Sequence, residues 1–442
     1  MSQSPPRPFH AHRSGPLAGV IRVPGDKSIS HRALMLGALA TGVTRITGLL
    51  EAEDVLNTAR VIELLGARVA RREGVFEVAG RGVGGLTRPS GPLDFGNSGT
   101  GCRLTMGVIA GHDVEARLVG DASLSRRPMR RVLTPLRQMG LGVAEDRETL
   151  PLTIRGTSSL VPIEYATPVP SAQVKSAILF AGLGASGETT VIEREPTRDH
   201  TERMLRYFGA EVKTAERDGR NAVTVTGDAE LEGKPVAVPG DPSSAAFLAA
   251  AAAIVPGSEV TIAGVLVNET RTGFYTTLKE MGADVTFANP REENGEPIAD
   301  IRVRHRPLTG VVVPAGRAPS MIDEYPVLSA VAAFASGETR MEGLAELKVK
   351  ESDRLAATAA GLAAQGGLAK VDGDTLIVAG NTTARGGGTV VTHMDHRIAM
   401  AFLILGLGAD RPVAVDDITF VATSFPAFTA LMGTVGARLE AR

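Results

Sequence analysis

The chain has 442 residues, of which 43% are hydrophobic and only 4% are aromatic. Its 47 basic and 49 acidic residues nearly cancel, which excludes the large positive charge typical of proteins that mainly bind nucleic acid. The longest alanine-rich run, residues 245–255, is far shorter than the roughly 20 residues of a membrane span. The single cysteine, Cys102, cannot form an intrachain disulfide. We expect a cytoplasmic protein that binds neither nucleic acid nor a membrane.

Residues 1–16 contain Pro, Ser, His and Arg without an apolar core. This composition differs from that of a signal peptide, and we expect a loose tail.

The first repeat of secondary structure follows this segment. Apolar residues at helical spacing after Asp26 predict a helix, and the alternating residues 44–49 predict a strand. Residues 54–65 predict a second helix, followed by short extended runs at 67–71 and 75–79.

Two features of this segment recur along the chain. A pattern that ends helices, Leu or Met followed by Gly and a β-prone residue, returns with a period of roughly 70 to 85 residues. It occurs at Gly66, Gly140, Gly209, Gly282, Gly366 and Gly436. A second series of helices rich in Ala and Leu begins at polar capping residues. These are Asp26, Asn97, Ser171, Asp241, Ser320 and the segment 392–395. The sequence therefore predicts six repeats, each with two helices and intervening strands.

The tripeptide Pro-Gly-Asp occurs at 24–26 and again at 239–241, near the middle of the chain. Six repeats with this echo indicate two domains of three repeats: residues 24–238, and residues 1–23 plus 239–442. The chain would cross between them near residues 23 and 239, leaving a cleft that opens or closes. Only the first copy is followed by Lys27, His31 and Arg32, so we interpret the tripeptide as architecture and these cations as candidates for function.

Several helix starts suit the binding of anions, because a helix N-terminus presents unpaired N–H groups and partial positive charge. Lys27, Ser28 and Arg32 lie on the first turns of one helix, although solvated surface charges would give the same pattern. The glycines of residues 96–101 allow close approach of a ligand, but such caps are also common in plain structure.

The next two candidate binding segments also have both a functional and a purely structural explanation. Arg126 and Arg127 lie side by side in the predicted turn 120–128, which an ordinary surface loop also explains. Ser171 and Gln173 open the third helix and suit hydroxyl groups of a ligand, or serve only as caps.

The second half carries acidic residues among its cations. Asp323 is expected one turn inside an apolar helix, where a carboxylate is costly unless it is paired or used. Residues 348–354 alternate cations with acids, which alone would indicate a solvated face. His393, Asp395 and His396 suggest a metal site, but we disfavour it because no fourth ligand is evident.

Seven of these segments resemble, in order along the chain, the motifs of the 5-enolpyruvylshikimate-3-phosphate synthase family, the 3-phosphoshikimate 1-carboxyvinyltransferases. Several look like the bacterial class II branch. The segments are Pro-Gly-Asp-Lys-Ser-Ile-Ser-His-Arg at 24–32, Gly-Asn-Ser-Gly-Thr at 96–100, Arg-Pro-Met at 127–129, Ser-Ala-Gln-Val-Lys-Ser at 171–176, Asp-Glu-Tyr-Pro at 323–326, Val-Lys-Glu-Ser-Asp-Arg at 349–354 and Asp-His-Arg at 395–397.

The resemblance implies an α/β fold, a two-domain inside-out α/β barrel of six βαβαββ repeats, three in each domain. It also implies transfer of the enolpyruvyl group of phosphoenolpyruvate to the 5-hydroxyl of shikimate 3-phosphate. Phosphate is released through a tetrahedral intermediate, on the pathway to chorismate and the aromatic amino acids. Acids, bases and cation clamps suffice for this chemistry, so we expect no metal and no cofactor.

Residue roles follow from the same resemblance. Asp323 would be the general base, Glu351 its partner in proton transfer at the methylene carbon, and Lys27 would assist both substrates. Shikimate 3-phosphate would be bound by Lys27, Ser28, Arg32, Ser171, Ala172, Gln173, Arg198, Asp323 and Lys350. Phosphoenolpyruvate would be bound by Lys27, Asn97, Gly99, Arg127, Gln173, Arg354 and Arg397.

The sequence departs from the family pattern at two places. Ala172 stands where many relatives have Ser, which removes one hydrogen bond to the substrate phosphate or leaves it to Arg198. Residues 422–426 lack the lysine that other members place before Phe425-Pro426, so the phosphoenolpyruvate site should hold one cation fewer. Gly99 is expected to leave room for the inhibitor glyphosate.

Two alternatives remain at this point. The enolpyruvyl transferase that acts on UDP-N-acetylglucosamine resembles this chain in fold, but it usually carries a reactive cysteine on a loop, whereas Cys102 is predicted inside a helix. A catalytically inactive repeat protein that binds an anionic partner is the second. We expect a monomer.

Overall fold

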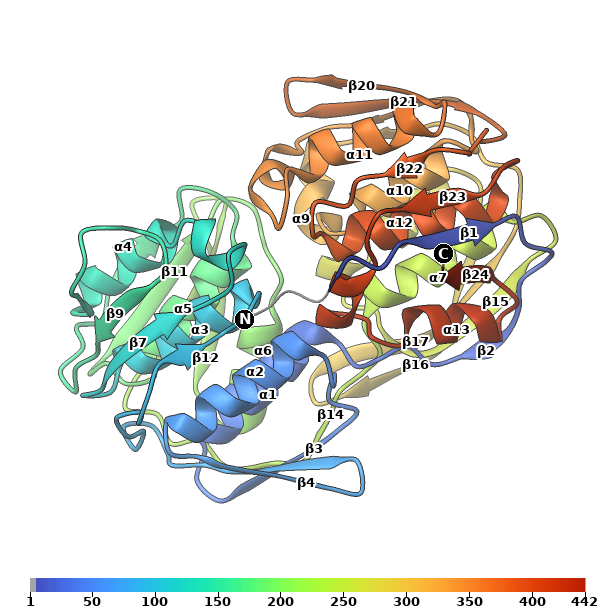
Figure 1. Cartoon of the computed structure of the whole chain (residues 1–442). Coiled ribbons are helices and arrows are strands. Elements are labelled where there is room, and N and C mark those ends of the chain that lie inside the picture. Colours follow the sequence, from blue (N-terminus) through green and yellow to red (C-terminus); the bar gives the residue numbers. More distant parts are fainter. Residues whose placement is uncertain (1–4, 442) are drawn as a thin grey trace. The chain divides into compact units, whose positions relative to one another are not determined.

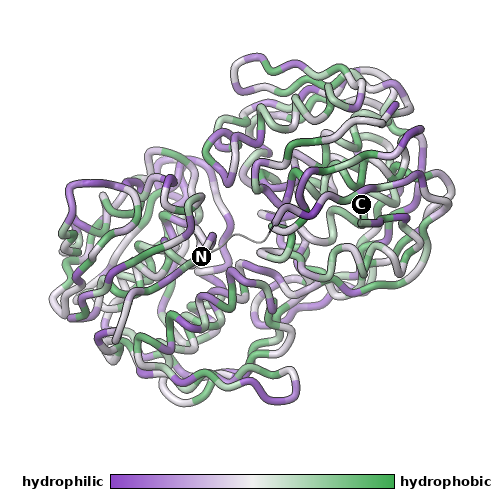
Figure 2. Tube along the Cα trace, viewed as in Figure 1, coloured by the Kyte–Doolittle hydropathy of each residue, from purple (hydrophilic) through white to green (hydrophobic). Residues whose placement is uncertain are grey.

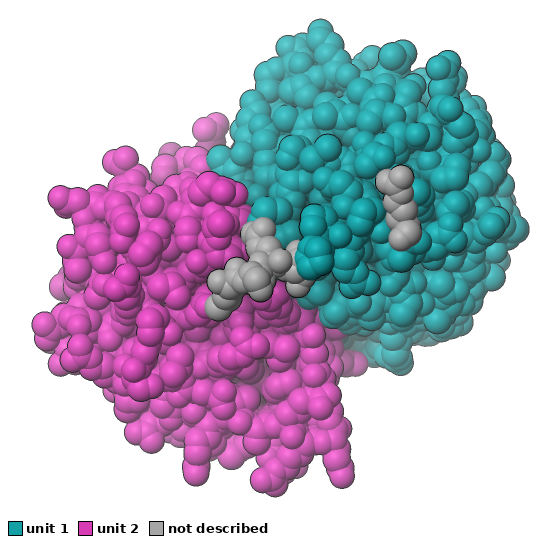
Figure 3. Space-filling view, viewed as in Figure 1, with its two compact units in different colours: residues 1–24, 239–292, 297–442 teal, residues 25–238, 293–296 magenta. Residues whose placement is uncertain are grey.

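The computed structural model describes residues 5–441 and contains, within them, six four-stranded sheets with helices (Figure 1). The chain divides into two compact units (Figure 3). Unit 2 comprises residues 25–238 and 293–296, and unit 1 comprises residues 1–24, 239–292 and 297–442. The chain thus passes between units near the two expected positions, and also at the turn 293–296. That the units are domains that open and close stays a prediction.

Unit 2 contains the first three repeats. Its helices are α1 (Lys27–Leu39), α2 (Glu53–Leu64), α3 (Gly99–Ala110), α4 (Arg130–Met139), α5 (Ala172–Gly182) and α6 (His200–Phe208). Its strands are β3 (Val43–Thr47), β4 (Arg68–Arg72), β5 (Val75–Ala79), β6 (Leu93–Asp94), β7 (Glu115–Val119), β8 (Gly142–Val143), β9 (Leu152–Arg155), β10 (Glu164–Ala166), β11 (Glu188–Glu193), β12 (Val212–Arg217), β13 (Arg220–Thr226) and β14 (Val236–Ala237).

Unit 1 contains the last three repeats and the N-terminal strands. Its helices are α7 (Pro242–Ile254), α8 (Gly273–Glu280), α9 (Ala318–Met321), α10 (Tyr325–Ala332), α11 (Arg354–Ala364), α12 (His396–Gly408) and α13 (Phe428–Thr434). Its strands are β1 (Phe9–His12), β2 (Ala18–Ile21), β15 (Glu259–Leu266), β16 (Asp284–Glu293), β17 (Glu296–Arg304), β18 (Val312–Val313), β19 (Ser336–Met341), β20 (Leu368–Asp372), β21 (Thr375–Asn381), β22 (Thr389–Val390), β23 (Val413–Val415) and β24 (Arg438–Ala441).

The sheets share one plan, in which an edge strand runs parallel to its neighbour and the next strand is antiparallel. Within unit 2 the strand orders are β14-β3-β5-β4, β6-β7-β9-β8 and β10-β11-β13-β12. Within unit 1 they are β2-β15-β17-β16, β18-β19-β21-β20 and β22-β23-β1-β24. The expected βαβαββ repeat is confirmed, and in each unit one sheet is completed by a strand from the other end of that unit's chain.

The N-terminal segment is not the loose tail that the composition indicated. Strand β1 lies inside a sheet, antiparallel to β23 and β24, with Phe9 paired to Val415 and to Ala441. Phe9 and Ala11 are buried. The expectation failed because the strand is short and its partners lie at the other end of the sequence. Residues 1–4 of this expectation lie outside the described residues.

The glycines predicted to end helices confirm the repeat. Gly66, Gly140, Gly209, Gly282, Gly366 and Gly436 all have φ between +76° and +116°. This left-handed backbone is open to glycine at little cost and terminates helices.

Most predicted helix caps are confirmed. The side chains of Asp26, Ser171, Asp241 and Asp395 accept hydrogen bonds from the first turns of α1, α5, α7 and α12. Helix α3 is capped by Ser98 instead of its neighbour Asn97. Ser320 does not cap a helix; it lies inside the short helix α9.

Both cores are built around helices that are buried along most of their length, and in unit 1 the central helix α7 has no charged residue. Every residue of α7 is buried, and α7, α10 and α12 pack against one another in unit 1, where long apolar stretches of the trace are visible (Figure 2). In unit 2, α3 packs against α1 and α5. A helix without a polar face belongs in the interior of a large core. Among the described residues, no helix combines the length and apolar character needed to cross a membrane.

Candidate functional site

The start of α1 presents two of the predicted residues of unit 2. Asp26 Oδ1 accepts a hydrogen bond from the N–H of Ile29 at 2.7 Å and so begins the helix. Lys27 follows directly, and its ammonium group forms an ion pair with Asp54. Lys27 and Ser28 are both half-buried, so their polar groups remain within reach of a ligand.

Arg32 lies one turn further and points into unit 2. Its guanidinium donates hydrogen bonds to Thr201 Oγ1 at 2.7 Å, to Ser176 Oγ at 2.8 Å and to the carbonyl of Ser28 at 3.0 Å. Burial lowers the pKa of Arg32 to about 10, although Glu202 and Asp26 raise it. The structure therefore shows Arg32 held by three protein groups, each on or beside an element with a predicted substrate residue.

Arg198 is close enough to Arg32 for its charge to lower that pKa further. It lies in the loop between β11 and α6 and is half-buried. Two cations that repel each other in one unit favour the binding of an anion, and guanidinium groups match phosphate geometry.

Residues around the start of α3 form a second cationic group. Arg127 Nη2 donates to Asn97 Oδ1 at 3.0 Å, and Asn97 Nδ2 donates to Asp121 Oδ2 at 2.7 Å. A Cβ atom on Gly99 would lie 2.8 Å from Arg127 Nη1 and 2.9 Å from Arg103 Nη1. The absence of a side chain at Gly99 therefore lets two guanidinium groups approach the helix start.

Arg103 is a residue that the sequence reasoning missed. Its Nη1 donates to Gln173 Oε1 at 3.0 Å, and Gln173 Nε2 donates to Thr100 Oγ1 at 2.9 Å. These bonds join the starts of α3 and α5. The signal was available, because Arg103 lies four residues after Gly99 and so on the same face of the helix.

Ser171 and Ala172 open α5 beside Gln173. Ser171 Oγ accepts a hydrogen bond from the N–H of Val174 at 3.4 Å, a long cap that leaves the hydroxyl donor for another group. Ala172 offers no side-chain hydrogen bond. Both residues are half-buried.

His31 was a candidate for function from the comparison of the two Pro-Gly-Asp segments, but the family resemblance gave it no specific role. It is fully buried, with Nδ1 2.8 Å from Thr58 Oγ1 and Nε2 3.5 Å from Ser98 Oγ. Burial, together with the charges of Lys27 and Arg32, lowers the pKa of His31 well below its ordinary value. A neutral His31 thus links α1, α2 and the cap of α3 beneath the predicted substrate residues.

In unit 1 the central residue is Asp323. The sequence predicted that it lies inside a helix, but the structure places it in a turn between α9 and α10. The helix is interrupted here for a steric reason. Pro326 lacks an N–H group, and its ring would clash with the carbonyl of Ile322 in a continuous helix. The chain instead stops α9 at Met321 and restarts α10 at Tyr325.

Three predicted cations surround the Asp323 carboxylate. Oδ1 lies 3.2 Å from Arg354 Nη1, 3.6 Å from Lys350 Nζ and 4.0 Å from Arg397 Nε. Arg397 Nη1 also donates to the Asp323 carbonyl at 3.2 Å. Opposite charges at these distances favour the ionised carboxylate, the form that can accept a proton.

Arg354 connects the acids of this group and is only 1% exposed. It donates to Asp395 through Nε at 2.8 Å and Nη2 at 3.2 Å, and Nη2 lies 2.6 Å from Glu351 Oε2. Burial alone would lower the pKa of Arg354, but the charges of Asp395, Glu351 and Asp323 outweigh it and raise the pKa. Arg354 therefore holds Asp323 and Glu351 on one guanidinium.

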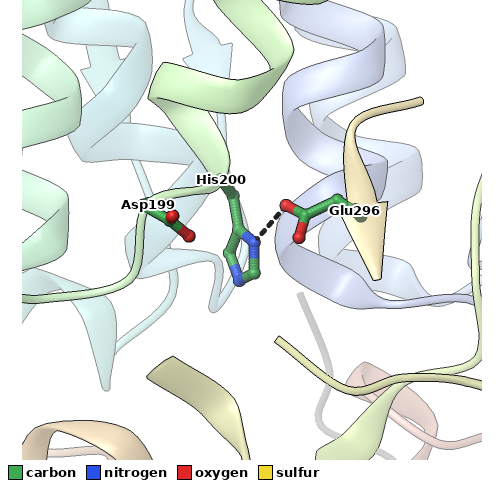
Figure 4. A group of neighbouring side chains, drawn as sticks. All are labelled: Asp199, His200 and Glu296. Carbon is green, nitrogen blue, oxygen red and sulfur yellow. Dashed lines mark hydrogen bonds and ion pairs between the residues drawn. The ribbon is translucent and has the colours of Figure 1, made fainter. Parts of the chain in front are cut away.

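His393, Asp395 and His396 do not form a metal-binding group in residues 5–441. The group with suitable spacing there is Asp199, His200 and Glu296, whose ligand atoms lie within 4.8 Å of one another (Figure 4). His200 Nδ1 lies 2.7 Å from Glu296 Oε1, and Arg203 Nε donates to Asp199 Oδ2 at 2.7 Å. Since a guanidinium already neutralises part of this group, we interpret it as a hydrogen-bonded cluster.

Cys102 lies inside α3 and is buried. Burial raises the pKa of its thiol to about 12, so the thiolate needed for nucleophilic chemistry is scarce at neutral pH. This environment differs from that of a reactive cysteine on a loop.

With this geometry in place, comparison with known proteins decides the family. The profile described as EPSP synthase (3-phosphoshikimate 1-carboxyvinyltransferase) matches residues 11–432. The chain belongs to the EPSP synthase family. A 3-phosphoshikimate 1-carboxyvinyltransferase of Methylorubrum populi is 57% identical over 99% of this chain and 98% of its own length. One of Rhodospirillum rubrum is 58% identical with the same coverage of both chains.

Solved structures agree with this assignment. An EPSP synthase of Acinetobacter baumannii is 43% identical, with a TM-score of 0.87 over 99% of this chain and 100% of that one. The enolpyruvyl transferase NikO of Streptomyces tendae has a TM-score of 0.79 over 99% of each chain at 18% identity, which shows the shared fold. The two-domain enolpyruvyl transferase fold expected from the sequence is confirmed.

As a member of the EPSP synthase family, the protein is a transferase. It transfers the enolpyruvyl group of phosphoenolpyruvate to shikimate 3-phosphate in the biosynthesis of aromatic amino acids. The expectation of a 3-phosphoshikimate 1-carboxyvinyltransferase is confirmed over the two alternatives, the transferase of UDP-N-acetylglucosamine and an inactive repeat protein.

Proposed function

We propose that Asp323 is the general base that removes the proton from the 5-hydroxyl of shikimate 3-phosphate. The observation that carries this assignment is the position of Asp323, a carboxylate within 4.0 Å of Lys350, Arg354 and Arg397. These cations favour the ionised form before the reaction. They also suit the negative charges of the two substrates.

In this proposal the 5-hydroxyl oxygen attacks C2 of phosphoenolpyruvate while C3 receives a proton, which gives a tetrahedral intermediate. Loss of a proton from the resulting methyl group then expels phosphate and restores the carbon–carbon double bond. Glu351 is the partner in both proton transfers at the methylene carbon. Its contact with Arg354, 2.6 Å from Nη2 to Oε2, supports this role, since the same guanidinium also touches Asp323.

Shikimate 3-phosphate is bound in the proposal by Lys27, Ser28, Arg32, Ser171, Ala172, Gln173, Arg198, Asp323 and Lys350. The repulsion between Arg32 and Arg198 supports a phosphate site there. Arg32 already donates to three protein groups. In the proposal it therefore binds the phosphate through its positive charge and through the N–H groups that these three bonds do not use.

Phosphoenolpyruvate is bound in the proposal by Lys27, Asn97, Gly99, Arg127, Gln173, Arg354 and Arg397. The contact of Arg127 with Asn97 and its approach to the start of α3 support this set. Lys27 serves both substrates, and its ion pair with Asp54 indicates the direction in which its side chain is held before they bind.

The proposal assigns residues of both units to one reaction. It therefore includes two domains, residues 24–238 and residues 1–23 plus 239–442, that close when substrates bind. We further propose that the protein acts as a cytoplasmic monomer without metal or cofactor. Glyphosate is proposed to compete with phosphoenolpyruvate, because Gly99 places no side chain between Arg127 and Arg103.

The test is phosphate release from phosphoenolpyruvate, measured with and without shikimate 3-phosphate. We expect release only when both substrates are present, and a roughly 10²- to 10⁴-fold lower kcat for Asp323→Asn, the range for loss of a general base. The exposed Asp372 in unit 1 provides the matched control, since Asp372→Asn removes a carboxylate of the same unit without touching the site. Undiminished turnover of Asp323→Asn would refute the assignment of the base.

A further inference from the structure

Unit 2 contains a fully buried group of charges that no step of the reaction uses. We call Lys175, Glu193 and Glu202 the Lys175 cluster. Lys175 Nζ lies 2.7 Å from Glu193 Oε2 and 2.7 Å from Glu202 Oε1, and the three side chains are 0%, 0% and 3% exposed. They come from α5, β11 and α6 respectively.

Stability alone is a weak reason for such a cluster. Removing charges from water is costly, and well-packed apolar residues often stabilise a core as well or better. The cluster also holds two carboxylates against one ammonium group, so a further cation is needed nearby. Arg32 lies close by: its Nε donates to Thr201 Oγ1, one residue before Glu202, and the charge of Glu202 raises the pKa of Arg32.

The cluster holds the residue directly before Arg198. Lys175 Nζ donates to the carbonyl of Thr197 at 3.3 Å, and Thr197 Oγ1 donates to Glu193 Oε1. Both the main chain and the side chain of Thr197 are thus bound to the cluster. The loop 194–199 that carries Arg198 therefore has a fixed point one residue from the guanidinium.

The same two helices hold Arg32. Ser176 follows Lys175 on α5, and its Oγ accepts from Arg32 Nη2 at 2.8 Å. Thr201 precedes Glu202 on α6, and its Oγ1 accepts from Arg32 Nε at 2.7 Å and lies 2.7 Å from Ser176 Oγ. The Lys175 cluster and the contacts of Arg32 therefore involve neighbouring residues on both helices: Lys175 and Ser176 on α5, and Thr201 and Glu202 on α6.

We propose that Lys175 is a positioning residue for the substrate phosphate. Its ion pairs with Glu193 and Glu202 lock α5, β11 and α6 together, and its bond to Thr197 sets the position of Arg198 relative to Arg32. This inference rests on the proposed role of Arg32 and Arg198 in binding shikimate 3-phosphate.

The first experiment compares steady-state kinetics of wild type and Lys175→Met. We expect KM for shikimate 3-phosphate to rise roughly ten- to hundredfold, the range of one charged hydrogen bond, with kcat and KM for phosphoenolpyruvate nearly unchanged. Thr190→Val is the matched control: it removes a buried hydrogen bond, 2.8 Å to Thr224, from the same strand β11 but away from loop 194–199. An equal rise of both KM values in Lys175→Met would overturn the inference in favour of general damage.

A double-mutant cycle separates positioning from support of the fold. In an Arg198→Ala background, Lys175→Met should change KM for shikimate 3-phosphate by less than about twofold, the usual error of additivity. If the two effects multiply while Arg198→Ala alone behaves as proposed, Lys175 does not act through Arg198. If Arg198→Ala leaves that KM unchanged, the proposed role of Arg198 fails and this inference fails with it.

Thr197→Val keeps the inference testable if Lys175→Met does not fold. It removes one bond to Glu193 and leaves the ion pairs in place. Binding of shikimate 3-phosphate should weaken, while binding of shikimate, which lacks the phosphate, should not. Equal weakening of both ligands would contradict a role in positioning the phosphate clamp.

Discussion

Helices α1 and α7 begin with the same Pro-Gly-Asp sequence, one in each unit, and then diverge. In both, the aspartate caps the helix: Asp26 accepts from the N–H of Ile29 at 2.7 Å, and Asp241 from that of Ser243 at 3.0 Å. A Cβ on Gly25 would lie 2.0 Å from the carbonyl oxygen of Gly48, and one on Gly240 would lie 3.0 Å from Val23 Cγ2.

After the cap the two helices differ in their surroundings. Helix α1 continues with Lys27, whose side chain is 23% exposed, whereas α7 continues with Pro242 and is buried along its whole length. The carboxylate of Asp241 is bound by Arg271 Nη2 at 3.1 Å inside unit 1. The comparison teaches that this tripeptide specifies a backbone turn. The residue after the turn differs with its surroundings: it is the half-buried Lys27, proposed to bind substrate, in α1 and the buried Pro242 in α7.

The largest effect expected from this comparison is on stability. Arg271→Met leaves Asp241 buried without its ion pair, which should lower the free energy of unfolding by about 3–5 kcal/mol. Urea denaturation measures this, with Arg291→Met, at a more exposed arginine of unit 1, as the control. KM for both substrates should stay unchanged at temperatures where the variant is folded; a rise would mean that the start of α7 takes part in binding.

At the start of α1 the expected effect is on catalysis. Lys27→Met should lower kcat/KM by roughly ten- to hundredfold or somewhat more, because one charged hydrogen bond is worth about 1.5–3 kcal/mol. Lys213→Met removes an exposed lysine of the same unit and should have no effect. If Lys27→Met and Lys213→Met have the same kcat/KM, Lys27 does not contribute to catalysis and the proposed difference in function between α1 and α7 fails.

A smaller effect is expected from Gly99→Ala, at the start of α3. The methyl group would meet Arg127 Nη1 and Arg103 Nη1 at 2.8 and 2.9 Å, and these flexible ends must shift by a few tenths of an ångström or more. The inhibition constant of glyphosate should rise at least about tenfold, the effect of some 1.4 kcal/mol, with a smaller rise in KM for phosphoenolpyruvate. Equal inhibition constants for wild type and variant would remove the steric argument.

His31, inside α1, should make stability depend on pH. Burial and the charges of Lys27 and Arg32 lower its pKa in the folded protein, so the unfolded chain binds the extra proton first. Stability should therefore fall as the pH drops below about 6.5, by at most about 1.4 kcal/mol per pH unit for this one group. Urea denaturation of wild type and His31→Asn between pH 7.5 and 5.5 tests this, and an equal slope for both would exclude His31 as the source.

The smallest expected effect concerns Cys102. Since burial raises its pKa to about 12, iodoacetamide at pH 8 should leave the folded protein unmodified and label it after unfolding. Mass spectrometry measures the labelling, and Cys102→Ser should retain activity. Rapid labelling of the folded protein with loss of activity would contradict an inert thiol.

Local patterns allowed much of the fold to be predicted. The six glycines, four of the caps and the strand at 75–79 depend on neighbours within a few residues, and the structure places them as expected. Strand β1 was missed because its partners begin some 400 residues later in the chain, at Val413 and beyond. No local pattern contains that pairing.

The site was predictable in its residue types and less so in its contacts. Asp323 was placed in a helix because its apolar neighbours outweighed the signal of Pro326. The contacts of Arg32 with Ser176 and Thr201, and the Lys175 cluster, join side chains of α1, α5, β11 and α6, which lie far apart in the sequence and meet only in the folded chain. Buried charges of this kind have no sequence signature of their own.

The strands that complete the sheets of each unit determine when that unit can fold during translation. Unit 2 has all of its strands once the ribosome has passed Ala237, the end of β14, and can form its sheets while the rest of the chain is made. Unit 1 must wait, because β1, among its first residues to emerge, pairs with β24 at residues 438–441. Strand β1 is thus without both of its partners until the ribosome has passed β23, and its sheet is complete only after residue 441.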